Sequence, residues 1–225
     1  MHIDETVCGK GGFALLYDGV IFDLDGTLWD SCQSVAASWA ETLAERHGAL
    51  TVPTEEDVKS IMGMTAGQIA ETLFSAYGQD ALAVCLDCIA RENAYIAVHG
   101  ARLYPGVEAL FQAMSGSCGL YIVSNCQQGY IECFLEYTGF GKYIQDYECS
   151  GATGLGKAEN IRLIARRNGL RHPVYVGDTH MDQASAVTAG LPFIHAAYGF
   201  GHAEAPDGVI KAPLELLDRL RENHV

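Results

Sequence analysis

A nine-residue stretch near the start of the chain, VIFDLDGTL at residues 20–28, constrains the fold more than any other segment. Its first residues are β-branched or aromatic, which predicts a strand buried on both faces. Two acids, Asp23 and Asp25, end the apolar run, and Gly26 allows the chain to turn at once. Because open α/β sheets bind ligands at the carboxyl ends of their strands, these acids mark a candidate site.

Apolar segments at residues 119–123, 174–176 and 193–194 predict three more buried strands, and residues 143–147 predict a weaker one. Helical patterns lie between them at residues 107–114, 127–138, 157–168 and 181–189, and a last one covers residues 214–220. Strands that alternate with helices are typical of parallel sheets. The sequence therefore predicts an α/β fold with a Rossmann-like, doubly wound parallel sheet.

The segment between the first two strands is helical throughout. Ser31 is a plausible N-cap for its first helix, Thr54 begins a capping box, Thr65 begins a further helix, and residues 80–99 form a longer one. We therefore expect a core of residues 1–30 and 103–225. An all-helical insert at residues 31–102 should form a separate lobe over the strand ends.

Composition excludes several classes of partner. The formal net charge of −14 argues against nucleic acid and anionic membranes, and an anionic substrate would need local cations or a metal. No apolar run reaches membrane-spanning length, and residues 1–16 lack the pattern of a secretory signal. We expect a cytoplasmic protein with free thiols, and core packing for Cys85 and Cys88. Nothing in the sequence indicates the oligomeric state.

Two weaker signals follow later strands. Ser124 and Asn125 end the second apolar strand, where a hydroxyl and nearby amides could hold a phosphate, although a simple helix cap is the commoner role. Lys157 opens a helix, where it opposes the helix dipole, so a bound anion would explain it better than helix stability does. The alternative is an exposed surface lysine. The preceding glycines nearly match a nucleotide P-loop, but Ala158 replaces the required Ser or Thr.

Two further acids, Asp178 and Asp182, come after the third buried strand. Carboxylate oxygens gathered from several strand ends suit Mg²⁺, which binds few carboxylates and keeps some of its waters. The sequence therefore predicts a magnesium site at this edge of the sheet.

Four motifs therefore follow one another along the chain, at residues 23–27, 124–125, 157 and 178–182. In this order they resemble the motifs of the haloacid dehalogenase superfamily of phosphohydrolases, and of its phosphoglycolate phosphatases in particular. The resemblance implies that Asp23 is the nucleophile and is phosphorylated, while Asp25 is the general acid and then the general base. It implies that Ser124, Asn125 and Lys157 bind the phosphoryl group. Mg²⁺ would be held by the Asp23 carboxylate, the Asp25 main-chain carbonyl and Asp178, with Asp182 contributing through water. The helical insert would be a cap.

The function predicted is Mg²⁺-dependent hydrolysis of a small phosphorylated metabolite through an aspartyl-phosphate. Phosphotransfer of the phosphoglucomutase type on a sugar phosphate is one alternative, and a non-catalytic phospho-acceptor regulator is another. Two departures weaken phosphoglycolate as the substrate. The related enzymes commonly carry prolines after the lysine, where this chain has Ala158-Glu159-Asn160, and residues 40–90 offer only Arg46 and Lys59 as cations.

Cys126 lies two residues past Ser124. A helix start nearby should favour its thiolate. We therefore expect Cys126 to make the activity sensitive to thiol alkylation.

Overall fold

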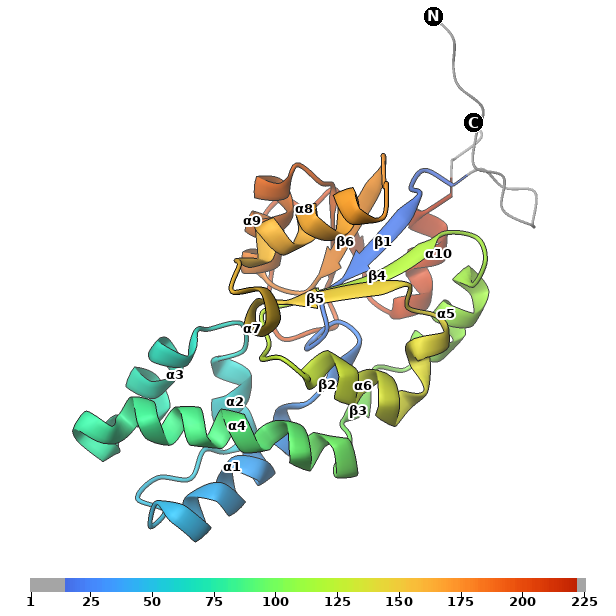
Figure 1. The fold of residues 1–225 in the computed structure, drawn as a ribbon. Coiled ribbons are helices and arrows are strands. Elements are labelled where there is room, and N and C mark those ends of the chain that lie inside the picture. The colour runs from blue at the N-terminus through green and yellow to red at the C-terminus, as the bar shows by residue number, and fades with distance from the viewer. Residues whose placement is uncertain (1–14, 222–225) are drawn as a thin grey trace, which may run out of the picture.

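A six-stranded parallel sheet forms the centre of the protein, whose computed structural model describes residues 15–221 (Figure 1). Most of the predicted loose extension, residues 1–16, lies outside the described residues. The strand order is β5-β4-β1-β6-β7-β8, and every neighbouring pair is parallel. The strands are β1 (Gly19–Phe22), β4 (Gly119–Ser124), β5 (Asp146–Cys149), β6 (Pro173–Gly177), β7 (Phe193–Ala196) and β8 (Gly208–Ile210).

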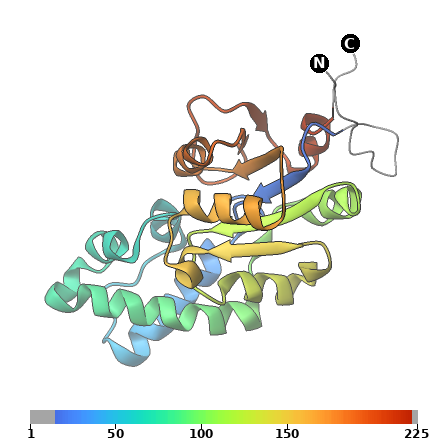
Figure 2. The ribbon, with the colours of Figure 1, turned by 45° about the horizontal axis from the view of Figure 1, so that its top comes forward.

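Helices cover both faces of this sheet (Figures 1 and 2). One face packs against α8 (Lys157–Arg167) and α9 (His180–Ala189), and the other against α5 (Val107–Met114), α6 (Tyr130–Thr138) and α10 (Leu216–Arg219). Strand β1 shows the consequence most clearly, because all four of its residues are buried. Val20 and Phe22 join the apolar cluster on one face, and Ile21 joins the cluster on the other. The predicted doubly wound α/β fold is confirmed.

The segment between β1 and β4 consists mainly of helices, which we call the helical insert: α1 (Cys32–Arg46), α2 (Glu55–Ser60), α3 (Ala66–Leu73), the 3-10 turn η1 (Ser75–Asp80) and α4 (Ala81–His99). The predicted capping box at Thr54 is present, because Thr54 exchanges hydrogen bonds with Asp57, and Thr65 forms a second, unpredicted one with Gln68. Helix α4 packs against α1 and α3 within the insert and against α6 of the core. The insert therefore lies beside the sheet and contacts the core through the packing of α4 on α6 (Figure 1).

Two short strands join the insert to the core. Strand β2 (Trp29–Asp30) pairs in antiparallel fashion with β3 (Arg102–Leu103), and Arg102 forms an ion pair with Asp30. The sequence did not predict these strands, because two residues are too few to show a period. The boundaries proposed at residues 30 and 103 fall at this pair, and the division into two domains stays a prediction.

Several elements on the periphery differ from the prediction. The weak strand expected at residues 143–147 is β5 at Asp146–Cys149, an edge strand whose partly exposed acids hide its apolar pattern. The expected loop at residues 150–156 contains a short helix, α7 (Ser150–Thr153). Helix α6 begins at Tyr130, three residues later than expected. The 3-10 turns η2 (Phe140–Lys142) and η3 (Pro213–Glu215) and strand β8 were not predicted.

Two expectations from composition can be compared with the structure. The cysteines that the structure describes are all free thiols, and Cys85 and Cys88 are buried in the apolar core of the insert. Across residues 15–221, no helix is both long and apolar enough to cross a membrane.

Candidate active site

The carboxyl ends of β1, β4 and β6 meet at one edge of the sheet, beneath the helical insert. A cavity of about 330 Å³ lies between that edge and the insert. Core residues that line it include five of the predicted site residues: Asp23, Asp25, Ser124, Asn125 and Lys157. The sixth, Asp178, is fully buried directly behind the loop that follows β1. The parallel sheet therefore brings together all the residues that the sequence singled out.

Lys157 is buried and points at the acids, so the alternative of an exposed surface lysine is wrong. Its Nζ lies 3.0 Å from Oδ1 of Asp23 and 2.5 Å from Oδ1 of Asp182. Burial alone lowers the pKa of Lys157, but the carboxylates of Asp182 and Asp23 outweigh burial and raise this pKa well above its ordinary value. The amine is therefore a fixed cation on the cavity wall.

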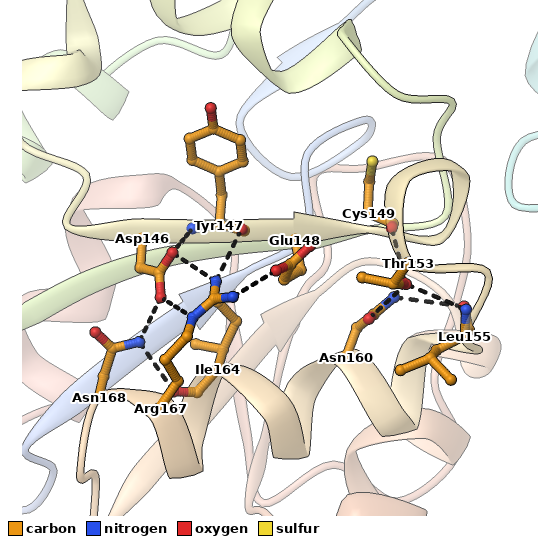
Figure 3. A network of polar contacts seen from close by, with 10 residues as sticks. All are labelled: Asp146, Tyr147, Glu148, Cys149, Thr153, Leu155, Asn160, Ile164, Arg167 and Asn168. Atoms are coloured by element: carbon orange, nitrogen blue, oxygen red, sulfur yellow. Dashed lines mark hydrogen bonds and ion pairs between the residues drawn. The ribbon is translucent and has the colours of Figure 1, made fainter.

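A polar network joins α8, the helix that begins at Lys157, to β5 and to the turn before the helix (Figure 3). Arg167, at the far end of α8, donates to Asp146 at 2.7 and 2.8 Å and to Glu148 at 2.6 Å. At the near end, Thr153 Oγ1 donates to Asn160 Oδ1 at 2.8 Å. Asn160 Nδ2 also donates to the Leu155 carbonyl at 3.4 Å, so the Asn160 side chain fixes the turn that leads into the lysine.

Asp25 receives three hydrogen bonds on one carboxylate oxygen. Trp29 Nε1, Ser31 Oγ and Tyr130 Oη donate to its Oδ1 at 2.9, 2.5 and 3.0 Å. Burial raises the pKa of Asp25, and these three donors act against that rise. Ser31 precedes α1 as predicted, but its side chain caps nothing in the helix, because the hydroxyl is turned to Asp25. All three donors hold Oδ1, and no hydrogen bond between described residues reaches Oδ2, while Asp25 itself lines the cavity.

Asp23, Asp178 and Asp182 form a buried acidic group whose ligand atoms lie within 4.8 Å of one another. The chain crowds around Asp178: Gly26 has φ +83°, and a Cβ there would lie 2.3 Å from Asp178 Oδ2. Burial raises the pKa of Asp178 to about 7, and the charge of Asp182 adds to the rise. Hard carboxylate oxygens that repel one another in this way fit a divalent cation such as Mg²⁺.

The three acids are held to different degrees. Asp182 Oδ1 accepts from Lys157, and its Oδ2 accepts from Thr179 N at 3.0 Å and Thr179 Oγ1 at 2.7 Å in the capping box of α9. Both oxygens of Asp178 also have donors, from Thr27 Oγ1 at 3.4 Å and Phe200 N at 2.8 Å. Asp23 accepts from Lys157 on Oδ1, and no hydrogen bond between described residues reaches its Oδ2, so Oδ2 of Asp23 is the most available oxygen of the three acids for a metal.

Ser124 and Asn125 border the cavity opposite Lys157. Because α6 begins only at Tyr130, a loop follows them instead of the helix start that the sequence suggested. Asn125 Oδ1 accepts from Ser150 Oγ at 3.0 Å, which leaves the amide nitrogen to donate elsewhere. Helix α7 packs closely on this loop, since a Cβ on Gly151 would lie 2.4 Å from the backbone nitrogen of Gln128.

The thiol of Cys126 lines the cavity, but its predicted acidity is wrong. Burial raises the pKa of Cys126 well above its ordinary value. The thiol with a lowered pKa is that of Cys149, at about 7, where a hydrogen bond from Cys126 stabilises the thiolate. The helix start that was expected to activate Cys126 lies several residues further along the chain, at Tyr130.

Sequence analysis missed Glu92 of α4, which lines the cavity from the insert. Glu92 Oε2 accepts from Trp39 Nε1 at 2.9 Å, and its Oε1 accepts from Gln127 Nε2 at 3.0 Å. One signal was available: Glu92 lies on the same helical stripe as Cys85, Cys88 and Ile96, which are all buried. An acid on an apolar stripe is a candidate functional group.

Comparison with known proteins agrees with this geometry. Residues 20–196 match the family model described as haloacid dehalogenase-like hydrolase. A phosphoglycolate phosphatase of Rhodospirillum rubrum is 32% identical over 194 residues, which is 80% of each chain. A phosphoglycolate phosphatase of Rhodobacter capsulatus is 28% identical over 213 residues, 91% of each chain.

A solved structure shows the same fold. The haloacid dehalogenase-like hydrolase of Streptococcus pneumoniae superimposes with a TM-score of 0.77 at 22% identity, over 91% of this chain and 98% of that one. The match to the family model covers most of the chain and spans every strand from β1 to β7. The resemblance inferred from the four motifs is confirmed: the chain belongs to the haloacid dehalogenase-like hydrolase family.

Proposed function

We propose that the protein is a Mg²⁺-dependent phosphatase that hydrolyses small phosphomonoesters through an aspartyl-phosphate on Asp23. One observation carries the proposal: the Asp23 carboxylate, the Asp25 carboxylate and the Lys157 ammonium line one cavity together. Phosphoryl transfer depends mainly on positioning and on neutralising charge, and this arrangement supplies both. The named relatives are phosphoglycolate phosphatases, and phosphoglycolate is a small phosphomonoester, which supports small phosphomonoesters as the substrate class.

Asp23 is placed to attack phosphorus. Burial, followed by the charge of Asp182, raises the pKa of Asp23, and Lys157 opposes that rise. Bound Mg²⁺, held by Asp23, Asp178 and the Asp25 carbonyl, would favour the carboxylate forms and neutralise charge on the phosphoryl oxygens. Lys157 would offset the remaining charge, and Ser124 and Asn125 would orient the phosphoryl group. The bond from Asp23 oxygen to phosphorus forms as the bond to the leaving alcohol oxygen breaks.

Asp25 serves both halves of this reaction. Its Oδ1 is held by three donors, so the Oδ2 atom carries the proton to the leaving alcohol oxygen. The same oxygen then takes a proton from the water that cleaves the aspartyl-phosphate. Burial raises the pKa of Asp25, which favours the protonated form needed for the first half.

The alternatives have less support. A sugar-phosphate mutase needs a second group to orient a second phosphate, but Lys157 is the only cation among the described residues that line the cavity. A phospho-acceptor regulator needs neither an insert over its aspartate nor an acid such as Asp25 beside it.

The test is a panel of small phosphomonoesters assayed with Mg²⁺, with EDTA, and with EDTA followed by added Mg²⁺. We expect turnover that depends on Mg²⁺ and is restored by it. A rapid acid quench should trap phosphate on the wild-type chain and none on the Asp23→Asn variant. Slow single phosphorylation without turnover would support the regulator, and transfer of phosphate to a sugar would support the mutase.

A further inference from the structure

The two walls of the cavity differ in chemistry. The core wall carries the acids and Lys157, whereas the wall formed by the helical insert is mainly apolar. Nine large apolar side chains of the insert line it: Val35, Trp39, Val58, Ile61, Met62, Met64, Ile69, Leu86 and Ile89. The phosphoryl group must sit against Asp23, so the alcohol part of a substrate faces this apolar wall.

The insert offers this alcohol part no cation. Lys59 is exposed and does not line the cavity; its Nζ lies 6.0 Å from the ring centroid of Phe200, which does. The arginines near the insert are held by acids elsewhere, in the pairs Arg46–Asp87, Arg91–Glu45 and Arg102–Asp30. A second anion on the substrate would therefore be taken from water without a partner, which is unfavourable.

Glu92 is the ionisable group that the insert places on this wall. It is only 6% exposed, and each of its two oxygens accepts one hydrogen bond, from Trp39 and Gln127. Since each carboxylate oxygen has a second lone pair, both can accept another donor. Burial raises the pKa of Glu92 to about 7, so the group is mostly ionised at pH 8.

We propose that the insert selects phosphomonoesters whose alcohol part carries no second anion, and that Glu92 binds an ammonium or another hydrogen-bond donor on that part. The proposal rests on the phosphatase function proposed above. It predicts a preference unlike the one that the names of the relatives state. Glu92 repels a carboxylate and attracts an ammonium at the same position, and the apolar wall accepts the carbon atoms of either.

The first test compares three two-carbon substrates at pH 8 in Mg²⁺: phosphoethanolamine, ethyl phosphate and phosphoglycolate. We expect kcat/KM to fall in that order, with about a tenfold or greater span, because a hydrogen bond to a charged group is worth at least that much. A preference for phosphoglycolate would overturn the proposal. If none of these compounds and no aryl phosphate is hydrolysed, the phosphatase function itself fails.

The second test changes the charge of Glu92 and keeps its shape. Glu92→Gln should reduce the ratio of kcat/KM for phosphoethanolamine over phosphoglycolate by about tenfold. Glu71→Gln is the control, since Glu71 is exposed on α3 and does not line the cavity. If Glu92→Gln changes kcat/KM equally for all three substrates, Glu92 only supports the structure and the proposal is wrong.

The third test adds the missing cation. Leu86 and Leu82 lie one turn apart on α4 and are both 48% exposed, but only Leu86 lines the cavity. Leu86→Arg should raise kcat/KM for phosphoglycolate relative to ethyl phosphate, and Leu82→Arg should not. An equal response of the two variants would overturn the proposal. The proposal would also be overturned if the wild type preferred phosphoglycolate and Lys59→Met abolished that preference. Lys59 would then supply the cation.

Discussion

The edge of the sheet and the face of the helical insert enclose the same cavity, yet they are built in opposite ways. The edge gathers charged side chains that hold one another, with the Lys157 ammonium between Asp23 and Asp182. The insert places apolar side chains there and a single acid, Glu92. The wall at the sheet edge is suited to a charged phosphoryl group, and the wall of the insert is suited to the alcohol part of a phosphomonoester.

Under the proposed function, the sheet edge would carry out the phosphoryl transfer, and the insert would select the substrate. Changes at the sheet edge should alter the rate for every substrate, because every phosphomonoester presents the same phosphoryl group. Changes on the insert should alter the ratio of rates between substrates. Of the four predictions below, three concern the sheet edge and one the buried acid of the insert, and they run from the largest expected effect to the smallest.

Asp23→Asn should abolish turnover, with a loss of at least about 10⁴-fold in kcat, because an amide is not a nucleophile toward phosphorus. Steady-state assays on several substrates measure it, and circular dichroism checks the fold. A variant that keeps a tenth of the wild-type rate would show that Asp23 is not the nucleophile.

Asp25→Asn should reduce kcat by about 10²- to 10⁴-fold, because proton transfer to the leaving oxygen and from water is lost. The side-chain oxygen can still accept from Trp29, Ser31 and Tyr130, so the fold should persist. Mg²⁺ affinity, measured by titration calorimetry, should change little, since the Asp25 ligand proposed is its carbonyl. Asp178→Asn is the comparison and should weaken Mg²⁺ binding strongly. A large affinity loss in Asp25→Asn would make its side chain a metal ligand.

Glu92→Gln should change how stability depends on pH. The pKa of Glu92 is about 7 in the folded protein against 4.5 for an ordinary glutamate, so the folded state binds a proton that the unfolded state has lost. This contribution makes the wild type less stable as pH rises from 4.5 to 7, by roughly 3 kcal/mol in total at about 1.4 kcal/mol per pH unit.

Urea unfolding of both proteins at pH 5 and pH 8 measures that dependence. The stability of Glu92→Gln relative to the wild type should increase by about 2–3 kcal/mol between the two pH values. Glu71→Gln should show no such change, because its carboxylate is exposed. The same relative stability of Glu92→Gln at both pH values would mean that Glu92 titrates normally.

Tyr130→Phe should reduce kcat by about tenfold, because it removes one of three hydrogen bonds to Asp25 and such a bond to a charged group is worth about 1.5–3 kcal/mol. The loss should be similar for phosphoethanolamine and phosphoglycolate, since Tyr130 acts through Asp25. A loss confined to one substrate would place Tyr130 among the groups that select the alcohol.

The architecture of the core follows from local sequence. Strands β1, β4 and β6 are continuous apolar runs, and a polar residue of the candidate site stands at or just after the end of each: Asp23, Ser124 and Asp178. The pair β2–β3 and the edge strand β5 were missed or misplaced. Their register depends on partners far along the chain, and their few residues show no period of their own.

The candidate site divides in the same way. Asp23, Asp25 and Asp178 stand next to strands, so topology alone brings them together. The partners of Asp25 could not be foreseen, because Ser31 fits an N-cap equally well and Tyr130 lies 105 residues away in sequence. The burial of Lys157 depends on how α8 rests on β5, which follows from side-chain contacts of Arg167 and Asn160.

The pair of strands that joins the insert to the core has a consequence for engineering. Strand β2 leads out of the core and β3 returns beside it in antiparallel register, so the pair is a hairpin whose loop is the entire insert. A helical module could replace the insert between Asp30 and Arg102 without cutting the sheet if its ends lie one strand spacing apart and it packs on α6 as α4 does. A grafted module must still begin with a hydroxyl-bearing residue at position 31. Ser31 is the first residue of the insert, but its hydroxyl donates a hydrogen bond to Asp25 of the core. In chimeras that keep this hydroxyl, the substrate preference should be transferred together with the insert.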